Sequence, residues 1–312
     1  MTRYGDPATR PSLDPSRYSL EEDERQFFAL LTGINDEEEL KKHILAVQEK
    51  AYQVYGYPCI RRFSFAKLKI ARLPGYPKAL KLLEQRKDPI LLDIGCCFGN
   101  DARKAVVDGW PAENVVASDL RPEFWNFGHE LFKSTPKSFP ATFIAGDVFS
   151  PATLDISDTQ PSPNSNSTTE VKQPPPIHPL RDLTSLTPLK HRLSAIHASS
   201  FFHLFPEDSQ RELARRLAFL LLPEKVARPE KGFRFETVRK DNDGTAVASE
   251  IRLRAMFCHS PESWKKLWEE DIFGPHQDVK VKVDAELQEV ELWDYRDLEP
   301  TIYLLNWSIE VV

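Results

Sequence analysis

The chain has 312 residues, of which 41% are hydrophobic, so it can bury a sizeable core as one α/β domain with additions. Its formal net charge is −6, from 41 basic and 47 acidic residues, and no basic run alternates with aromatic side chains, so a nucleic-acid partner is not expected. The N-terminal residues contain no apolar stretch of the signal-peptide type, and no apolar run approaches the roughly 20 residues of a membrane span. We therefore expect a cytoplasmic protein without a membrane partner.

The cysteines do not indicate a metal site. Cys96 and Cys97 are neighbours, but no C-x-x-C motif or Cys/His cluster accompanies them. Together with Cys59 and Cys258 they are expected to be reduced, structural thiols. No bound metal is therefore expected.

The N-terminal part of the chain predicts helices. Residues 1–18 contain prolines and no hydrophobic periodicity, and they are expected to be disordered or loosely attached. Ser19 is expected to cap a first helix, a second helix is predicted over 36–54, and a short one over 72–85. The apolar face of the first helix is expected to consist of Phe27, Phe28, Leu30 and Leu31.

The stretch from Pro89 to Val148 organises the rest of the chain. It predicts three short apolar strands separated by two helices, the first beginning near Asp101 and the second covering 123–133. The strands are predicted over 90–94, 114–118 and 141–145. Each strand ends in or is followed by an acid, and these acids are Asp93, Asp119 and Asp147. Because open α/β sheets bind ligands at the carboxyl ends of their strands, the three acids are predicted to surround a ligand.

The small residues and acids of this stretch fit a nucleoside. Small residues in the turn after the first strand let the backbone approach a ligand, and amides at the start of the next helix favour negative charge. Asp119, about 20 residues beyond the glycines, is placed to accept hydrogen bonds from ribose hydroxyls, and Asp147 lies where it can reach an adenine amino group. A dinucleotide motif G-x-G-x-x-G would need glycine at Cys97 and Asn100, whereas the pattern is D-x-G-x-x-x-G.

These residues resemble the class I S-adenosylmethionine-dependent methyltransferases, whose first motif is D-x-G-x-G-x-G, with Cys97 here in the place of the middle glycine. The resemblance is closer to fungal O-methyltransferases of secondary metabolism, particularly the meroterpenoid methyltransferases of the austinol and terretonin pathways. It is carried by LLDIGCCFGNDARK, by HASSFFHLF at 197–205 and by FCHSPESWKKLW at 257–268, and it extends from about Gly56 to the end of the chain.

The resemblance implies S-adenosylmethionine as cofactor and a Rossmann-like α/β sheet with helices on both faces. Residues 89–312 would then form the S-adenosylmethionine-binding methyltransferase domain. Residues 1–88 would form an N-terminal helical cap, because in such methyltransferases the N-terminal helices cover the cofactor and shape the acceptor pocket.

Residues 150–190 form a low-complexity insertion rich in Pro, Ser, Thr and Asn. The insertion falls between the third strand and a fourth strand predicted over 193–198, at the ligand end of the sheet. We interpret it as a disordered insertion rather than a substrate lid. Its composition predicts that it is dispensable for folding.

The sheet is predicted to lose a member after the helix at 207–222. Pro223 and Pro229 bracket a polar stretch where the family has an apolar strand, and proline is excluded from central strands. The fifth strand is therefore predicted to be missing or degenerate, which puts full activity in doubt. The stretches 279–293 and 302–311 are predicted to form an antiparallel pair that closes the sheet.

The resemblance and the motif positions together predict the site residues. The cofactor site is expected to contain Asp93, Gly95, Cys96, Cys97, Gly99, Asn100, Asp119, Leu120, Asp147, Val148 and Ser199. The acceptor site is expected to contain Tyr57, Arg61, Ser200 and His203. His203 is also the candidate catalytic residue.

The predicted reaction is methyl transfer to an oxygen of a small organic acceptor. A carboxylate acceptor is ionised at neutral pH and needs no general base, whereas a phenol would need one, for which His203 is the candidate. Two alternatives stay open at this point: a nicotinamide-dependent oxidoreductase, and a degenerate methyltransferase-fold binding protein, which the missing strand and Cys97 favour. A homodimer also stays open.

Overall fold

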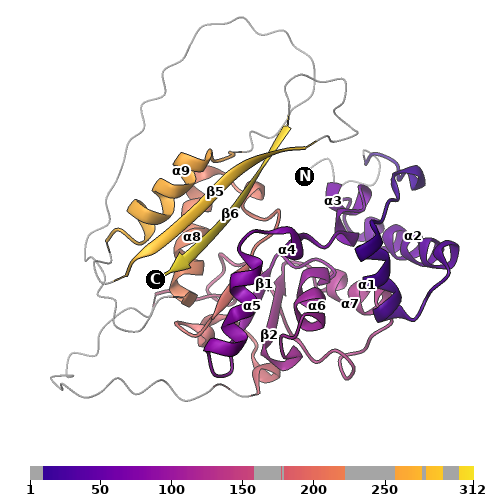
Figure 1. Cartoon of the computed structure of the whole chain (residues 1–312), viewed down its shortest axis with the longest axis horizontal. Helices are drawn as coiled ribbons and strands as arrows, with labels where there is room; N and C mark the ends of the chain where they lie inside the picture. The colour runs from indigo at the N-terminus through magenta and orange to yellow at the C-terminus, as the bar shows by residue number, and fades with distance from the viewer. Residues whose placement is uncertain (1–9, 158–176, 178, 222–256, 276–278, 291–301) are drawn as a thin grey trace, which may run out of the picture. The chain divides into compact units, whose positions relative to one another are not determined.

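A computed structural model describes residues 10–157, 177, 179–221, 257–275, 279–290 and 302–312 (Figure 1). The chain divides into two compact units, which are described separately below. The first comprises Met1–Phe201 with Arg216–Leu222, and the second comprises Phe202–Arg215 with Pro223–Val312. Among the described helices, none has both the length and the apolarity needed to cross a bilayer.

The first unit begins with α1 (Glu22–Thr32), α2 (Glu37–Val54) and α3 (Pro58–Arg61). The predicted second helix is confirmed, and the Asp36 side chain caps it by accepting a hydrogen bond from the Glu39 amide at 2.8 Å.

The first helix is capped by Glu21, so the prediction that Ser19 is the N-cap is wrong. Glu21 and Glu24 form a reciprocal capping box, in which the Glu24 carboxylate accepts from the Glu21 amide at 2.8 Å. Phe27 and Phe28 are buried as expected, but Leu30 is 67% exposed and is not part of the apolar face.

Residues 10–18 pack against this helical layer, in contrast to the expected loose attachment. The Tyr52 hydroxyl donates to the Pro11 carbonyl at 2.7 Å, and Arg61 Nε donates to the Ser12 carbonyl at 2.9 Å. Leu13 and Tyr18 contact the buried cluster formed by α1 and α2. The segment preceding them, 1–9, lies outside the described residues.

Within the described ranges, the central sheet consists of four parallel strands in the order β3-β2-β1-β4. They are β1 (Leu91–Ile94), β2 (Val115–Asp119), β3 (Thr142–Ala145) and β4 (Ala195–His197). All four residues of β1 are buried, which agrees with a strand that is covered on both faces, and Asp93 is the one polar side chain among them. The predicted α/β fold with a parallel sheet is therefore confirmed. Its helices on both faces and its cap boundary at residue 88 stay predictions.

One face of β1 and β2 is covered by helices. The cluster there joins strand residues to α5 (Tyr76–Gln85), α6 (Asn100–Val107) and Trp125 of α7 (Pro122–Leu131). A second cluster joins α1 and α2 to α7 and to Phe98. In Figure 1, α2 lies beside α1 and α7. The N-terminal helices therefore pack on α7 and on the turn that follows β1.

The helix predicted over 72–85 is confirmed as α5 from Tyr76 to Gln85, and it begins four residues later than predicted. The short helix α4 (Lys69–Arg72) ends before Pro74, and α5 begins at Tyr76 with Pro77 in its first turn. Pro77 costs no helical hydrogen bond, because the amides of the first helical turn have no partner within the helix. A proline within a continuous helix would remove one such bond.

Both ends of the 150–190 insertion belong to the core. Their buried leucines are Leu154, Leu180, Leu186 and Leu189. The Leu186 amide donates to the Thr153 carbonyl at 2.7 Å, and the Arg216 guanidinium donates to the Leu154 carbonyl at 2.7 Å. The prediction that the whole insertion is dispensable for folding is therefore wrong at its ends. Residues 158–176, in its middle, lie outside the described residues.

The second unit contains a two-stranded sheet and an aromatic cluster. Its strands β5 (Val281–Val290) and β6 (Ile302–Val311) pair antiparallel along their full length, which confirms the predicted pair. In the described residues this pair is a sheet of its own. Helix α9 (Pro261–Lys266) continues into a π-helical segment, Leu267–Ile272. The cluster is formed by Phe202, Trp264, Trp268 and Trp307.

Helix α8 (Glu207–Leu221) agrees with the helix predicted over 207–222. The predicted loss of the fifth strand concerns the chain after Leu221, and it lies outside the described residues.

Candidate functional site

The turn between β1 and α6 is built from left-handed backbone. Gly95, Cys97 and Gly99 have φ values of 71°, 52° and 70°. The amides of Gly95 and Cys96 both donate to the Ser118 carbonyl, at 2.8 and 3.2 Å, which fastens the turn to the end of β2. Glycine takes this conformation without a steric penalty, whereas at Cys97 the left-handed backbone costs about 1 kcal/mol of conformational free energy.

The two glycines of the turn are also points of close packing. A Cβ atom on Gly95 would lie 2.5 Å from the Phe201 ring, and one on Gly99 would lie 2.5 Å from the Trp125 ring. Gly128 of α7 approaches the same turn, because its Cβ would lie 2.2 Å from the Phe98 carbonyl oxygen. The turn is therefore held between aromatic rings and the backbone of α7.

Arg103, on α6, stabilises the turn by hydrogen bonds to its carbonyls. Its guanidinium donates to the carbonyls of Phe98 at 2.8 Å and Gly99 at 3.2 Å. The side chain is buried, with its guanidinium carbon 4.3 Å from the centre of the Phe139 ring and 4.7 Å from that of Phe132. Burial lowers the pKa of Arg103 to about 9. Arg103 therefore links the turn to the aromatic core.

Asp119 lies at the end of β2, directly beside the turn. Its two carboxylate oxygens accept from the Cys97 amide at 2.9 Å and the Arg121 amide at 3.0 Å. Burial raises the pKa of the Asp119 carboxyl, although these two amides oppose the shift. The N-cap position of α7 is Arg121, so Asp119 is not the cap of that helix.

Side chains from the N-terminal layer reach this end of β2. The Arg121 guanidinium lies 4.3 Å from the centre of the Tyr55 ring and is hydrogen-bonded to the Tyr57 hydroxyl. Burial raises the pKa of Tyr57. The Cys59 thiol is hydrogen-bonded to that of Cys97, which lowers the pKa of Cys59. The turn and Asp119 are thus in contact with the segment after α2.

A pocket of about 40 Å³ opens beside the turn. Its lining comprises Ser64, Phe65, Lys67, Lys69, Asp93, Gly95, Cys96, Cys97, Phe98, Asn100, Asp101 and Ser199. The N-terminal segment, the end of β1, the start of α6 and the chain after β4 each contribute to it. The pocket therefore lies at the carboxyl edge of the parallel sheet, where such sheets bind ligands.

Two acids and a histidine form a cluster where β1, β4 and the start of α6 meet, and the two acids line the pocket. Asp101 Oδ2 lies 3.1 Å from His197 Nε2, and Asp93 is the register partner of His197 across β1 and β4. Asp93 also accepts from the Ala102 amide at 3.2 Å.

The three groups of this cluster titrate differently. Burial raises the pKa of Asp93 to about 7. Burial opposes ionisation of Asp101 and His197 as well, but their mutual attraction prevails, so the pKa of Asp101 is lowered and that of His197 is raised. The contact between Asp101 and His197 therefore favours the charged form of both groups, whereas burial favours the neutral form of Asp93.

Asn100 is the first residue of α6 and lines the pocket. Asn100 is buried, with an exposed fraction of 6%. Both its amide nitrogen and its amide oxygen lack a hydrogen-bond partner among the described residues. A buried amide with neither bond satisfied is costly, so the position suits a polar ligand group.

The structure brings part of the predicted cofactor site together. The residues that line the pocket are Asp93, Gly95, Cys96, Cys97, Asn100 and Ser199. Gly99 and Asp119 lie next to it in the turn and at the end of β2. Leu120, Asp147, Val148, Tyr57, Arg61 and Ser200 do not line this pocket. Arg61 contacts the Ser12 carbonyl instead, and Asp147 accepts from the Phe149 amide at 3.0 Å.

His203 lies in the second unit, in the 3₁₀ helix Phe202–Leu204, and its catalytic role stays a prediction. The sequence reasoning missed Lys69, Asp101, Arg103 and His197. The sequence around Asp101 indicates only the start of a helix. Arg103 and His197 stand within the segments that carry the family resemblance, which was the available signal. The sequence contains no signal for Lys69, because α4 is a single helical turn and is too short to show hydrophobic periodicity.

Comparison with known proteins identifies the family. The model of the meroterpenoid methyltransferase N-terminal domain matches residues 13–66. The chain is 31% identical over 274 residues to methyltransferase adrK of Penicillium roqueforti, which covers 87% of this chain and 83% of adrK. The chain belongs to the meroterpenoid methyltransferase family. The predictions of a methyltransferase and of a link to fungal secondary metabolism are thereby confirmed.

Other relatives of this methyltransferase chain carry similar names. O-methyltransferase phiE of a fungal species is 31% identical over 235 residues, or 75% of this chain, and the match spans 65% of phiE, slightly less than two thirds of that relative. Methyltransferase ausD of Aspergillus calidoustus is 28% identical over 267 residues, covering 86% of this chain and 81% of ausD. The matched N-terminal domain, residues 13–66, contains α1, α2 and α3, so the helical layer beside the site is a feature of the family.

Proposed function

We propose that this chain is an S-adenosylmethionine-dependent O-methyltransferase that acts on a small organic acceptor in fungal secondary metabolism. The observation that carries the proposal is the hydrogen bond between Asp119 and the Cys97 amide, which joins the acid at the end of β2 to the left-handed turn after β1. Family membership supports the same reaction class.

The residues around the turn fit S-adenosylmethionine. The orphaned amide of Asn100 offers a donor and an acceptor to a polar ligand, and Asn100 lines the pocket together with Gly95. Asp119 would hold the ribose hydroxyls, while Asp147 and Val148 on the next strand's loop would contact the adenine. When bound, S-adenosylmethionine supplies a methyl group already activated by its sulfonium.

The protein's part in the reaction is to align an acceptor oxygen with the donor and to exclude water. Tyr57, Arg61 and Ser200 are proposed to contact the acceptor, and Tyr57 lies beside Asp119 through its bond to Arg121. A carboxylate acceptor needs no proton transfer, whereas a phenol would transfer its proton to His203. The acceptor is proposed to be a carboxylic acid or a phenol.

Calorimetry with three ligands tests the proposal. S-adenosylhomocysteine is expected to bind and to raise the melting temperature, and NAD is expected to do neither. Binding of NAD alone would support an oxidoreductase. Binding of S-adenosylhomocysteine without turnover of a panel of aryl and terpenoid acids and phenols would support a degenerate binding protein.

The ribose role of Asp119 has its own test. Asp119→Ala should weaken S-adenosylhomocysteine binding by one or two charge-assisted hydrogen bonds, each roughly 1.5–3 kcal/mol. Asp119→Asn keeps one acceptor for the Cys97 amide and separates loss of the turn from loss of the ribose contact. If both variants bind S-adenosylhomocysteine as the parent does, the assignment of Asp119 is wrong.

A further inference from the structure

We propose that Cys59 and Cys97 are an oxidation site, at which a hydroperoxide converts the two thiols into a reversible disulfide that weakens ligand binding beside the turn. Formation of the disulfide is independent of the proposed function. Its effect on the affinity for S-adenosylhomocysteine rests on the proposed function.

The two thiols come from different layers of the first unit. Cys59 belongs to α3 in the N-terminal layer, and Cys97 belongs to the turn between β1 and α6. Both are free and half-buried, they are hydrogen-bonded to each other, and both pack against the buried cluster that contains Phe98. Cys97 also lines the pocket, through which a small oxidant can reach the pair. Two cysteines far apart in the sequence are thus adjacent in space, as a disulfide requires.

Cys59 is the more reactive thiol of the pair. The hydrogen bond from the Cys97 thiol has the largest influence on the pKa of Cys59 and lowers it. The charge of Lys69 acts in the same direction, whereas burial and Asp119 oppose the shift. The same hydrogen bond, together with burial, raises the pKa of Cys97. Because the thiolate is the nucleophilic form of cysteine, Cys59 reacts with the oxidant and Cys97 then completes the disulfide.

The other two cysteines offer no equivalent pair. Cys96 is buried, its thiol donates to the Cys97 carbonyl at 3.8 Å, and burial raises its pKa well above the ordinary value. Cys258 is exposed and belongs to the second unit. Oxidation should therefore select Cys59 and Cys97.

The reaction consumes one hydroperoxide for each disulfide. The Cys59 thiolate attacks a peroxide oxygen and the O–O bond breaks, which gives a sulfenic acid and a hydroxide that takes up a proton to form water. The Cys97 sulfur then attacks the Cys59 sulfur, the S–S bond forms, and the S–O bond breaks. The departing hydroxide leaves as water with the proton of the Cys97 thiol. The two sulfurs lose two electrons, and the peroxide gains them.

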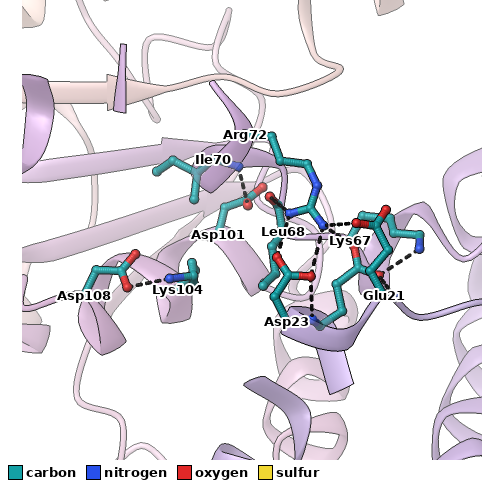
Figure 2. Close-up of polar contacts among 10 residues, drawn as sticks. Glu21, Asp23, Lys67, Leu68, Ile70, Arg72, Asp101, Lys104 and Asp108 are labelled. Carbon is teal, nitrogen blue, oxygen red and sulfur yellow. Dashed lines mark hydrogen bonds and ion pairs between the residues drawn. The ribbon is translucent and has the colours of Figure 1, made fainter. Parts of the chain in front are cut away.

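The chain around Cys59 is held in place by contacts that do not involve its thiol. The Gln48 side chain donates to the Ile60 carbonyl at 2.8 Å, which attaches α3 to α2. Figure 2 shows a second attachment, in which the Ile70 amide of α4 donates to Asp101 of α6 at 2.9 Å. The pair is therefore positioned without a covalent bond, so a disulfide there would act as a modification and not as a structural link.

The disulfide should act on the ligand through Cys97. An S–S bond of about 2.05 Å is much shorter than a hydrogen bond between thiols, so the sulfurs must approach each other. Because Cys59 is held, part of this movement falls on Cys97, whose amide donates to Asp119 at 2.9 Å. The amide, the Asp119 carboxylate and the wall of the pocket would shift with it. We therefore expect the oxidised protein to bind its ligand more weakly.

Peptide mapping and calorimetry of the same samples test the proposal. The protein is reduced with dithiothreitol, treated with hydrogen peroxide and digested without reduction. We expect a peptide linked through Cys59 and Cys97, its loss on renewed reduction, and an affinity for S-adenosylhomocysteine at least about fivefold lower in the oxidised protein. Cys59→Ser should remove the linked peptide and make the affinity insensitive to peroxide. Cys258→Ser, which removes the exposed thiol, is the matched control and should respond to peroxide as the parent does.

The outcomes separate the disulfide from its effect and from the proposed function. If the treated parent contains no linked peptide, or if Cys97 is linked to Cys96, the proposal is wrong. A linked peptide with unchanged affinity would overturn the effect on the ligand. If the reduced parent does not bind S-adenosylhomocysteine, the proposed function fails, and the linked peptide still decides whether the disulfide forms.

Discussion

Single residues around the turn carry unusual electrostatic states. Asp93 is a buried acid whose pKa is raised to about 7, because burial penalises its charged form. Next to it lie Asp101 and His197, whose contact favours the charged form of both groups. A carboxyl that can be neutral at the pH of the cell lets the protein bury three titratable groups side by side.

Replacing Asp93 by Asn should change the pH dependence of stability. The folded state keeps the proton of Asp93 up to about pH 7, whereas an unfolded aspartate loses it near pH 4, so the contribution of Asp93 to stability falls as pH rises between these values. The difference in unfolding free energy, variant minus parent, should therefore increase by roughly 3 kcal/mol from pH 5 to pH 8. The increase arises between pH 5 and the Asp93 pKa of about 7, and each of these two pH units contributes about 1.4 kcal/mol.

Urea unfolding of both proteins at pH 5 and pH 8 measures this difference. Asp182→Asn, which removes an exposed carboxylate, is the control. A difference that stays constant between the two pH values would show that Asp93 is ionised throughout.

At the scale of the elements, the turn is fixed by what packs on it. Helix α7 approaches it at Gly128, and Arg103 of α6 donates to two of its carbonyls. The N-terminal layer contacts the turn through the hydrogen bond between Cys59 and Cys97. It also contacts Arg121, after the end of β2, through Tyr57. Substitutions at Arg103 or Gly128 should therefore alter the affinity for S-adenosylhomocysteine, although neither residue lines the pocket.

Gly128→Ala tests the contact between α7 and the turn. In a helix interior this change usually stabilises, by up to about 1 kcal/mol. Here the new Cβ would lie 2.2 Å from the Phe98 carbonyl oxygen, so the turn must shift, and overpacking of this kind costs about 1–3 kcal/mol. We expect a lower melting temperature and weaker S-adenosylhomocysteine binding.

The exposed Asn126 of the same helix provides the matched control, because Asn126→Ala should change the unfolding free energy by less than about 0.5 kcal/mol. Thermal unfolding and calorimetry are the measurements. A stabilised Gly128→Ala protein with unchanged affinity would show that α7 does not constrain the turn.

At the scale of the whole chain, the insertion between β3 and β4 has ends that contain buried leucines and a middle that is polar and rich in proline. Its flanks place Leu154, Leu180 and Leu186 in the core, while residues 158–176 contain Val171 as their only aliphatic or aromatic side chain. Low-complexity composition therefore describes the middle of the insertion and not its ends.

Two replacements of this insertion should behave differently. Replacing 158–176 with a short Gly/Ser linker should change the melting temperature by less than about 2 °C. Extending the replacement to 153–188 removes three buried leucines, each worth about 2–5 kcal/mol, and should abolish cooperative unfolding. Differential scanning calorimetry of both proteins decides. Similar stability of the two would mean that the buried leucines contribute little.

The sequence predicted the elements whose patterns are local. The strands and helices of 89–148 follow from apolar runs and helical spacing, and the glycine turn follows from its motif. The buried leucines of the insertion could not be predicted, because they are scattered singly among polar residues and gain their burial from distant partners such as Arg216.

The pocket shows the same limit. Gly95, Cys97 and Asn100 were predicted because they are consecutive parts of one motif. Lys69 and His197 come from segments about 30 residues before and 100 residues after that motif, and only the pairing of β1 with β4 and the bond from Asp101 to Ile70 bring them to it. Local spacing carries no information about such partners.

The position of β1 in the sheet has a consequence for how the protein is made. One edge of β1 pairs Leu91 with Val115, only 24 positions later, but the other pairs Leu91 with Ala195, 104 positions later. At a synthesis rate of about 5–20 residues per second, that second edge waits roughly 5–20 s on the ribosome before its partner exists. An unpaired apolar strand is a template for association with other chains. The nascent chain therefore passes through a period of exposure, and each residue of the insertion between β3 and β4 prolongs it.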